Sequence, residues 1–498
     1  MGIAVNAAVV LAARHFPFQD AANHIARYTL LAQAWWGAAP AEVHVRLLPT
    51  PYIALDVLGA ALVRVAGPDV ALRVLVLLAV VLLPVGMDLL LRQTAPHRRG
   101  WALAGVLLGF SWYLLDGLLN FVVGAGLVFV WLAWWWPRRD GAGVAPRLAL
   151  GAGAAGLFLV HLSAPLSALV VVWVDLGLAV LARVRAPRAW TGNAPVRPRV
   201  TTALAITAAV AAVFVAWTLV EVALGAKGSE GAVGFRGPAL KLAALGAPFY
   251  AFDLRQALLL AGGWAASLVA FLYVNRADLR PDPILASAAA FGLLFVAWPH
   301  SVGAAGGLDA RWLIFAYLLP FCATEGGRVP RQWPGLAVAL LAVAAHAGAV
   351  GLEVRRRDPL LTDYDAVLAQ LPRGSRLLPV VADGGAARRV GVYEEYAFWH
   401  VVRNAGRVPG LFNRSATRPT DPPFPHFAHF DLSVRRYVPP FGWGVKSFEP
   451  LDWRQIARDY DYIVQAGGDP RVARYLGAHA RVRRRVGAVT LYEVGRGP

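Results

Sequence analysis

Apolar segments long enough to cross a bilayer recur along the first two thirds of this chain. A helix needs about 20 apolar residues to cross the hydrocarbon core. The sequence is 58% hydrophobic and only 16% charged, whereas soluble proteins carry about 25% charged residues. Backbone polar groups have no water to bind inside a bilayer, so such segments must be helical. The sequence therefore predicts a mainly α, polytopic helical membrane protein.

Arginines gather in alternate loops between these segments, which predicts the topology. Clusters such as 98–99, 138–139 and 183–199 mark cytoplasmic loops by the positive-inside rule. The alternation holds if residues 49–66, which carry Asp56 and Arg64, lie on the outer surface without crossing. The predicted result is about 11 transmembrane helices with the C-terminus outside. The net charge of +18 is then explained by topology and membrane lipids, and no nucleic-acid partner is expected.

The chain changes character near residue 353. We expect a transmembrane domain over 1–352, with a first outer loop at 15–69, and an extracytoplasmic α/β domain over 353–498. The segments RLLPVVA, YDYIVQAG and VTLYEVG have strand length, and helical patterns lie between them. The single cysteine excludes an intrachain disulfide and a cysteine-based metal site. His426 and His429 could ligate a metal, but lone histidines on an aromatic loop are more often structural.

The strongest candidate for chemistry is the stretch HFPFQDAANHIARY, residues 15–28. Asp20, Asn23, His24 and Arg27 are spaced so that a helix places them on one face. Asp20 fits the N-cap or first turn, and as a carboxylate near the interface it could act as a general base. His24 could share the acid/base role or bind phosphate, and Arg27 could bind phosphate. The alternative is an interfacial helix whose polar side faces water.

Further candidates lie at the expected outer ends of helices, where polar groups at membrane depth are often functional. Arginine guanidinium groups suit bidentate phosphate contacts, and histidine, aspartate and asparagine suit hydrogen bonding to a substrate. Each also has a structural alternative: an interfacial anchor for Arg311, an ion pair with Arg311 for Asp309, a helix cap for the Asp116 and Asn120 pair, and packing for the histidines. The candidate substrate-binding residues are Arg27, Arg46, Arg311, His300, His161, Asp116 and Asn120.

The order of these features resembles the GT-C superfamily of membrane glycosyltransferases. A short first span precedes an outer loop that begins with an acidic residue, here Asp20. The segment PTPYIALDVLGAALVRVAGPDVALRVL is similar to the proline-started pattern of the lipid A aminoarabinose transferases and their relatives, with Pro49 and Pro51 in the proline region and Ala71, Leu72 and Arg73 in the later one. The chain departs from the family where Ala21 follows Asp20 and where an unaligned Arg46 stands in place of a lysine.

The resemblance implies a glycosyltransferase that uses a polyprenyl-phosphate-linked sugar and acts on the outer face of the membrane. It implies hexosyl or pentosyl transfer, with an inverting mechanism suspected, to a glycan, lipid or protein acceptor. It names no certain cofactor and leaves a divalent metal open, with no metal ligand assigned. The Arg- and Ala-rich composition suits a bacterial protein, so the expected location is the bacterial cytoplasmic membrane.

Two other classes of function compete with this interpretation. A transporter or flippase of a lipid-linked glycan predicts internal repeats and broken helices at the bilayer midplane, and the sequence shows no repeat. A membrane acyltransferase predicts a histidine with Asp or Asn deep in a span, which His161 and His346 fit poorly.

Overall fold

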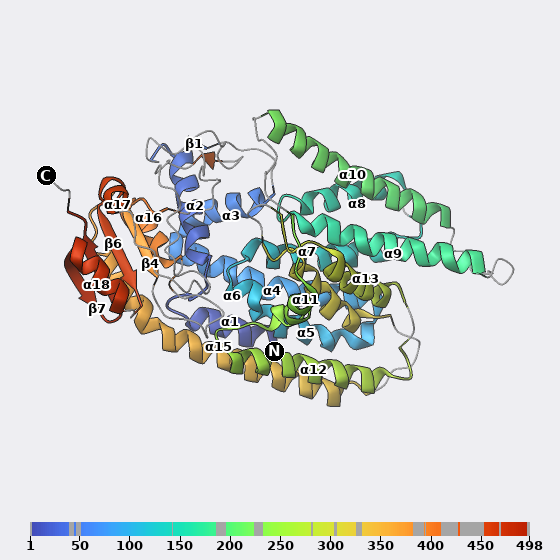
Figure 1. Cartoon of the computed structure of the whole chain (residues 1–498). Helices are drawn as coiled ribbons and strands as arrows, with labels where there is room; N and C mark the ends of the chain where they lie inside the picture. Colours follow the sequence, from blue (N-terminus) through green and yellow to red (C-terminus); the bar gives the residue numbers. More distant parts are fainter. Residues whose placement is uncertain are drawn as a thin grey trace.

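The computed structural model describes residues 2–38, 44–45, 51–141, 143–185, 196–223, 233–279, 282–302, 306–324, 331–381, 393, 395–409, 427–428, 453–467 and 470–495. The chain is mainly helical, as predicted, and a small sheet lies at one end of the molecule (Figure 1). Long helices run roughly along one direction, and α12 (Leu254–Asn275) packs alongside α15 (Trp333–Leu368). This arrangement is that of a polytopic membrane protein.

Among the described residues, 6 helices are long and apolar enough to cross a membrane. They are α4 (Pro68–Thr94), α7 (Leu119–Trp135) with the 3₁₀ turn η3 (Trp136–Arg138), α9 (Ser163–Arg185), α10 (Val196–Ala223), α12 and α15. Shorter apolar helices are α1 (Gly2–Ala12), α8 (Val144–Leu157), α13 (Pro283–Ala297) and the segment Ala310–Cys322. Helix length alone does not set the number of spans, so the predicted topology stays a prediction.

Two of the apolar segments are built from short helical pieces. The first contains η1 (Pro96–Ala102), α5 (Leu103–Leu107), η2 (Leu108–Phe110) and α6 (Trp112–Leu115). The second contains η5 (Ala310–Trp312), α14 (Leu313–Leu318) and η6 (Leu319–Cys322). Ser111 has extended backbone geometry and separates η2 from α6. Pro320 lies inside η6, where its ring restricts continuation of an α-helix.

The stretch around Asp20 forms α2 (Ala21–Trp35), which stands at a steep angle to the long helices in Figure 1. Helix α3 (Ile53–Ala66) packs against it. At 1.5 Å per residue, the 14 residues of α3 span only about 21 Å, less than the ~30 Å of a hydrocarbon core. The predicted surface position of residues 49–66 stays a prediction.

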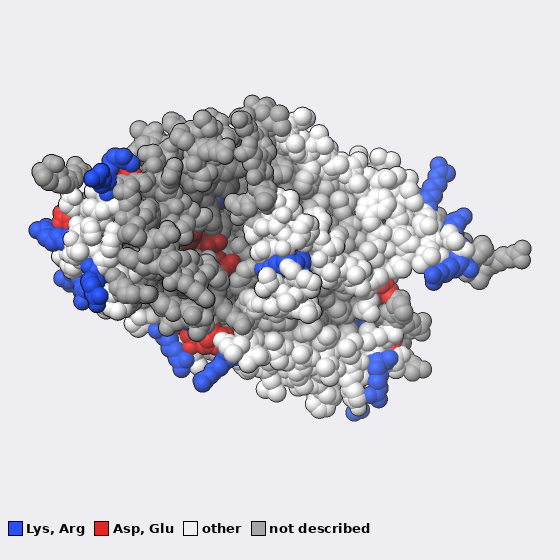
Figure 2. Space-filling model, in the orientation of Figure 1, with Lys and Arg blue, Asp and Glu red and all other residues white. Residues whose placement is uncertain are grey.

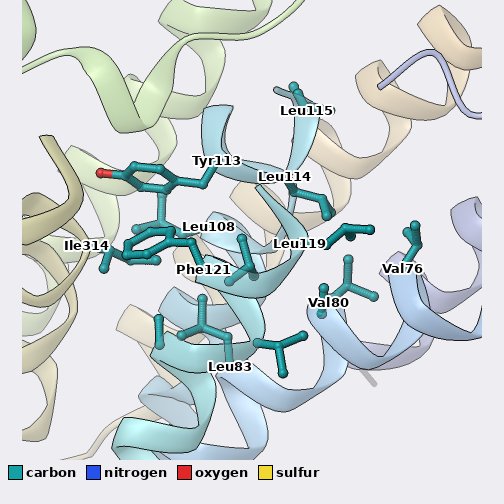
Figure 3. Packing of buried hydrophobic residues seen from close by; sticks show 14 of the residues in the cluster. Val76, Val80, Leu83, Leu108, Tyr113, Leu114, Leu115, Leu119, Phe121 and Ile314 are labelled. Atoms are coloured by element: carbon teal, nitrogen blue, oxygen red, sulfur yellow. The ribbon is translucent and has the colours of Figure 1, made fainter. Parts of the chain in front are cut away.

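The core of the membrane region lies between α4, α6 and α7 (Figure 3). Val76, Val80 and Leu83 of α4 pack with Leu119 and Phe121 of α7. Helices α4 and α7 approach closely because glycines face one another where they cross. A Cβ atom on Gly86 would lie 2.5 Å from the carbonyl oxygen of Gly126.

The C-terminal domain contains a four-stranded sheet in the order β4-β6-β8-β7. Strands β4 (Leu377–Val381) and β6 (Tyr462–Ala466) are parallel, whereas β8 (Val489–Glu493) runs antiparallel to both β6 and β7 (Arg481–Val486). The three predicted strand segments coincide with β4, β6 and β8. The expected boundary after residue 352 falls inside α15, which continues unbroken to Leu368. The polar residues after 352 therefore mark the end of the apolar composition but not of the helix.

Shorter elements complete the description. They are η4 (Ala247–Phe249), α11 (Pro238–Ala244), η7 (Tyr396–Phe398), α16 (Trp399–Asn404), α17 (Trp453–Asp459) and α18 (Pro470–His479), with the two-stranded pairs β1 (His44–Val45) with β5 (Phe427–Ala428) and β2 (Val233–Gly234) with β3 (Ser301–Val302). Helices α17 and α18 lie between the predicted strand segments, where helical patterns were expected.

We predict that Gly126→Ala destabilises the protein. The added Cβ would lie 2.9 Å from the Leu82 carbonyl carbon, so α4 and α7 must move apart, and overpacking of this kind costs about 1–3 kcal/mol. Thermal unfolding in detergent measures the loss. Gly292→Ala in α13 is the matched control, because a Cβ there meets nothing within 4 Å. Equal unfolding midpoints for the two variants would contradict the prediction.

Candidate functional site

Asp20 lies where two segments far apart in the sequence meet through their backbones. The amide of Gln19 donates to the Leu115 carbonyl at 3.1 Å, and the amide of Asp20 donates to the Asp116 carbonyl at 3.3 Å. Gly117 follows with a φ of +88°, and a Cβ there would lie 2.6 Å from the Asp20 Cβ. A glycine is needed for both reasons. The structure thus brings two predicted site residues, Asp20 and Asp116, to one place.

Asp20 occupies the expected N-cap position of α2, but its side chain does not cap the helix. Asp116 follows the last residue of α6. A side-chain cap of α2 therefore does not account for Asp20, whereas the helix-cap alternative for Asp116 stays open.

His24, one turn into α2, is buried and close to the Gly117 carbonyl. Burial, reinforced by the positive charge of Arg27, lowers the pKa of His24 to about 4. The imidazole is therefore neutral near pH 7. A neutral imidazole suits hydrogen bonding or proton acceptance more than binding of a phosphate by charge.

Arg27 is buried, and its guanidinium donates to the carboxylate of Asp56 on α3. Only 3% of Arg27 and 1% of Asp56 are exposed, so the pair ties α2 to α3 inside the protein. Its predicted phosphate contact stays a prediction. Asn23, on the same face, donates to Glu395 at 2.5 Å. Glu395 lies in the C-terminal part of the chain, which therefore reaches the candidate site.

Arg311 and His161 form a second part of the site. Nη1 of Arg311 lies 3.2 Å from Nε2 of His161, and Nδ1 of His161 lies 2.8 Å from the Ser163 hydroxyl. Burial and the Arg311 charge lower the pKa of His161 well below its ordinary value. The Ser163 backbone amide also donates to Nδ1, at 3.1 Å, so the single lone pair of neutral His161 faces donors at both nitrogens. Neutral His161 contacts the guanidinium without neutralising its charge.

Aromatic rings and one amide surround Arg311. The guanidinium lies 5.9 Å from the centre of the Phe121 ring, and the rings of Phe121 and Tyr52 both contact His161 edge-on. Asn120 is buried at the start of α7. Within the described part of the chain, Nε of Arg311 and Oδ1 of Asn120 make no hydrogen bond. Both atoms are buried and lack a protein partner among the described residues.

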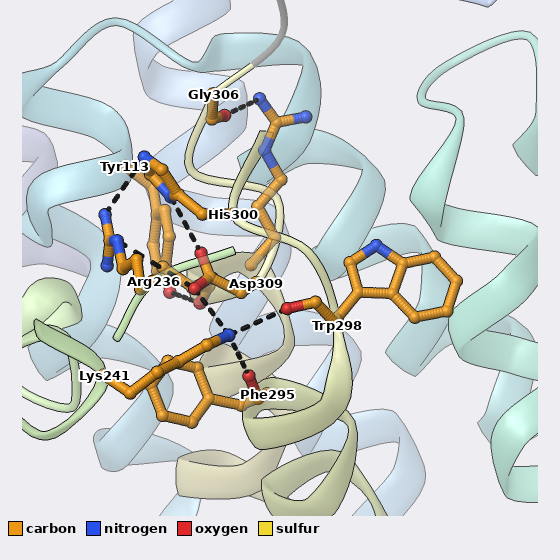
Figure 4. Close-up of polar contacts among 10 residues, drawn as sticks. Tyr113, Arg236, Lys241, Phe295, Trp298, His300, Gly306 and Asp309 are labelled. Carbon is orange, nitrogen blue, oxygen red and sulfur yellow. Dashed lines mark hydrogen bonds and ion pairs between the residues drawn. The ribbon is translucent and has the colours of Figure 1, made fainter. Parts of the chain in front are cut away.

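His300 belongs to an ionic cluster centred on Asp309 (Figure 4). The fully buried Asp309 carboxylate accepts from Lys241 at 2.8 Å and from Nδ1 of His300 at 3.2 Å, and Arg236 lies 4.0 Å away. Burial opposes the charge of Asp309, but the hydrogen bonds from Lys241 and His300 outweigh it and hold its pKa below the ordinary value. Asp309 therefore pairs with these three groups, where the sequence suggested Arg311.

Lys241 also donates to the carbonyl groups of Phe295 and Trp298, at 2.6 and 2.8 Å. Lys241 and Arg236 were not predicted as site residues, because their segment between α10 and α12 carries no recognisable motif and its loop charge indicates only topology. One signal was present, since lysine is rare in this arginine-rich sequence.

Helix α6 connects the two parts of the site. Its C-terminal end holds Asp20 through Leu115 and Asp116. From the same short helix, the Tyr113 hydroxyl donates to the Ala310 carbonyl, next to Asp309 and Arg311. Figure 2 shows a hollow in this face of the molecule between the positions of α2 and α6, with acidic side chains inside it and basic ones on the surface beside it. Carboxylates and cations thus flank one short helix.

The remaining predicted features contribute nothing further here. Arg46, His426 and His429 lie outside the described residues. Within the described ranges, no group of three or more His, Cys, Asp or Glu side chains is placed to hold a metal ion. A shallow groove in the C-terminal domain, lined by residues such as Ser375, Asp461, Arg481 and Glu493, contains none of the predicted site residues.

We predict that Arg27→Met destabilises the protein by about 3–5 kcal/mol, because it leaves the buried Asp56 carboxylate without its ion-pair partner. The double variant Arg27→Met/Asp56→Leu should recover part of this loss, since both charges are gone. Thermal unfolding in detergent compares the two. Arg481→Ala is the control: its pair with Glu493 is largely exposed and contributes little. An Arg27→Met protein as stable as the wild type would show that the pair does not join α2 to α3.

Comparisons with known proteins give limited similarity. No protein-family model matches the chain, and no curated protein matches it. A solved structure, the arabinofuranosyltransferase AftD from Mycobacteria, is similar with a TM-score of 0.49 and 16% sequence identity. The match covers 99% of this chain and 39% of AftD, so the chain spans about two fifths of that protein's length. A likeness of this degree does not carry the activity of AftD over to this chain.

Proposed function

We propose that this protein is an integral-membrane glycosyltransferase that moves a sugar from a polyprenyl-phosphate donor to an acceptor on the outer face of the membrane. The observation that carries the proposal is that Asp20 and Asp116 meet at the C-terminal end of α6. Tyr113 of the same helix donates to the Ala310 carbonyl, next to Arg311. A transfer of this kind needs a base for the acceptor and cations for the leaving phosphate. The outer location itself rests on the arginine-rich loops and stays a prediction.

The proposed reaction is a single displacement. The Asp20 carboxylate takes the proton of the acceptor hydroxyl or amine, and the acceptor atom forms a bond to the anomeric carbon of the sugar. The bond from that carbon to the phosphate oxygen breaks, and its electron pair leaves with the polyprenyl phosphate. Arg311, and His300 beside Arg236, hold the negative charge that develops there. Asp116 and Asn120 are placed to orient sugar hydroxyl groups, with inversion as the expected stereochemistry.

A reconstitution assay tests the proposal against the transporter alternative. The purified protein in liposomes is given polyprenyl-phosphate arabinose, mannose or glucose, and release of polyprenyl phosphate is measured with an acceptor oligosaccharide present. Release above that of protein-free liposomes with one donor supports a glycosyltransferase. Movement of labelled lipid between leaflets, with no release from any donor, would support the transporter instead.

We predict that Asp20→Asn lowers transfer by about 10²- to 10⁴-fold, the usual contribution of a general base. The variant keeps the shape of the side chain and should insert and unfold like the wild type. Asp253→Asn is the matched control, because Asp253 precedes α12 and its carboxylate caps the helix by accepting from Gln256. Asparagine caps a helix as well as aspartate does, so this control should retain transfer. Undiminished transfer by Asp20→Asn would remove Asp20 from the mechanism and leave His24 as the next candidate.

Arg311→Ala is expected to act differently. Loss of a charged hydrogen bond to phosphate weakens binding by about 1.5–3 kcal/mol, so the KM for the polyprenyl-phosphate donor should rise by roughly 10- to 150-fold. Initial rates over a range of donor concentrations measure this change. Arg255→Ala, at an exposed arginine in the first turn of α12, is the control and should leave the KM unchanged. An equal effect of both substitutions would indicate nonspecific charge attraction.

A further inference from the structure

His15, five residues before Asp20, is held between two carboxylates of α15. Its Nδ1 lies 2.7 Å from Oδ1 of Asp358, and its Nε2 lies 3.1 Å from Oδ2 of Asp365. Only 10% of the His15 side chain is exposed. The histidine belongs to the turn between α1 and α2, whereas both carboxylates belong to the part of α15 that leads to the C-terminal domain.

This geometry requires the charged form of the imidazole. A neutral imidazole has one N–H group and one lone pair, so one of its nitrogens would direct a lone pair at a carboxylate oxygen. The imidazolium donates from both nitrogens and satisfies both carboxylates. Burial opposes the charge, but hydrogen bonds to Asp365 and Asp358 outweigh it and raise the pKa of His15 above its ordinary value of 6.5.

The surrounding charges make this contact asymmetric. Asp365 also accepts from Arg403 of α16 at 2.6 Å and from the Tyr396 hydroxyl at 3.0 Å, and Asp69 of α4 acts on Arg403 electrostatically. The Tyr396 ring lies edge-on to His15, with centroids 6.4 Å apart. Asp365 therefore keeps two partners when His15 loses its proton. The charge of the His15 imidazolium therefore acts mainly to hold the turn between α1 and α2 against α15.

The neighbouring contacts that the structure describes are made by an arginine and by backbone groups. Arg73 of α4 donates to the carbonyl groups of Val10 and Leu11, at 2.9 and 3.0 Å, and lies over the Phe16 ring. The turn ends with the two backbone hydrogen bonds that place Gln19 and Asp20 against α6. Among these described contacts, His15 is the one made by an imidazole, whose charge depends on pH.

We propose that His15 is a positioning residue: as an imidazolium clamped between Asp358 and Asp365, it fastens the turn that carries Asp20 to the helix of the C-terminal domain. The contact is complete below pH 6.5 and is lost as the pH rises through the raised pKa of His15. Its effect on sugar transfer rests on the proposed function. The clamp itself does not, because it concerns the position of the turn.

Hydrogen exchange measured by mass spectrometry tests the clamp without any substrate. The peptide that contains Gln19 and Asp20 is followed in the full-length protein in detergent at pH 6 and pH 8.5, with rates corrected for intrinsic exchange. In the wild type, these amides should exchange about tenfold faster or more at pH 8.5, on the scale of a lost hydrogen bond to a charged group. Peptides from β6 serve as an internal reference and should not change.

Two variants separate charge from shape. His15→Gln cannot carry the charge and should exchange rapidly at both pH values, whereas His15→Lys stays charged and should remain protected at pH 8.5. Protection that is independent of pH in the wild type, or equal in the wild type and His15→Gln, would overturn the proposal. If the clamp holds, transfer by the wild type should fall with rising pH while His15→Lys resists the fall. A normal exchange result without any transferase activity would contradict the proposed function and leave the clamp intact.

Discussion

The absence of water from the bilayer core constrains the whole molecule. Each membrane segment must satisfy its own backbone polar groups, so it must be helical along its apolar length. Irregular backbone is tolerated where protein surrounds it. In this chain the broken stretch that ends in α6 packs against α4 and α7, and polar groups of the candidate site lie near its end. The close approach of Gly86 and Gly126 brings α4 and α7 together.

Charged side chains are paired differently in the two parts of the site. Around α2, the guanidinium of Arg27 is neutralised by Asp56 and buried, so it stiffens the helix pair. Around residues 309–311, the Asp309 carboxylate is paired with Lys241 and His300. The neighbouring Arg236 lies 4.0 Å from Asp309, and Arg311 contacts the neutral His161. Positive charge is therefore concentrated on one side of α6 and carboxylates on the other. A substrate that carries a phosphate at one end and hydroxyl groups at the other matches this polarity.

The sequence predicted the helical membrane class and the strands β4, β6 and β8, because apolar runs and their lengths carry that information. It did not predict β7, since RVRRRV is exposed along nearly all its length and lacks the alternation of a half-buried strand. The face of Asp20 and His24 followed from helical spacing. The contact of Asp20 with Asp116 did not, because it depends on a backbone approach allowed by Gly117. The contact of Glu395 with Asn23 was missed for a similar reason, because the two residues are distant in sequence.

Helix α15 continues from the membrane region into the C-terminal domain without a break. Its 36 residues correspond to about 54 Å of continuous helix. Pro359 lies inside this helix, where its missing N–H removes one backbone hydrogen bond, so the helix bends more easily there than elsewhere. A change in the tilt of α15 as a whole displaces β4, which follows it in the chain, by an amount that grows with distance along the helix, except for the part that bending at Pro359 absorbs.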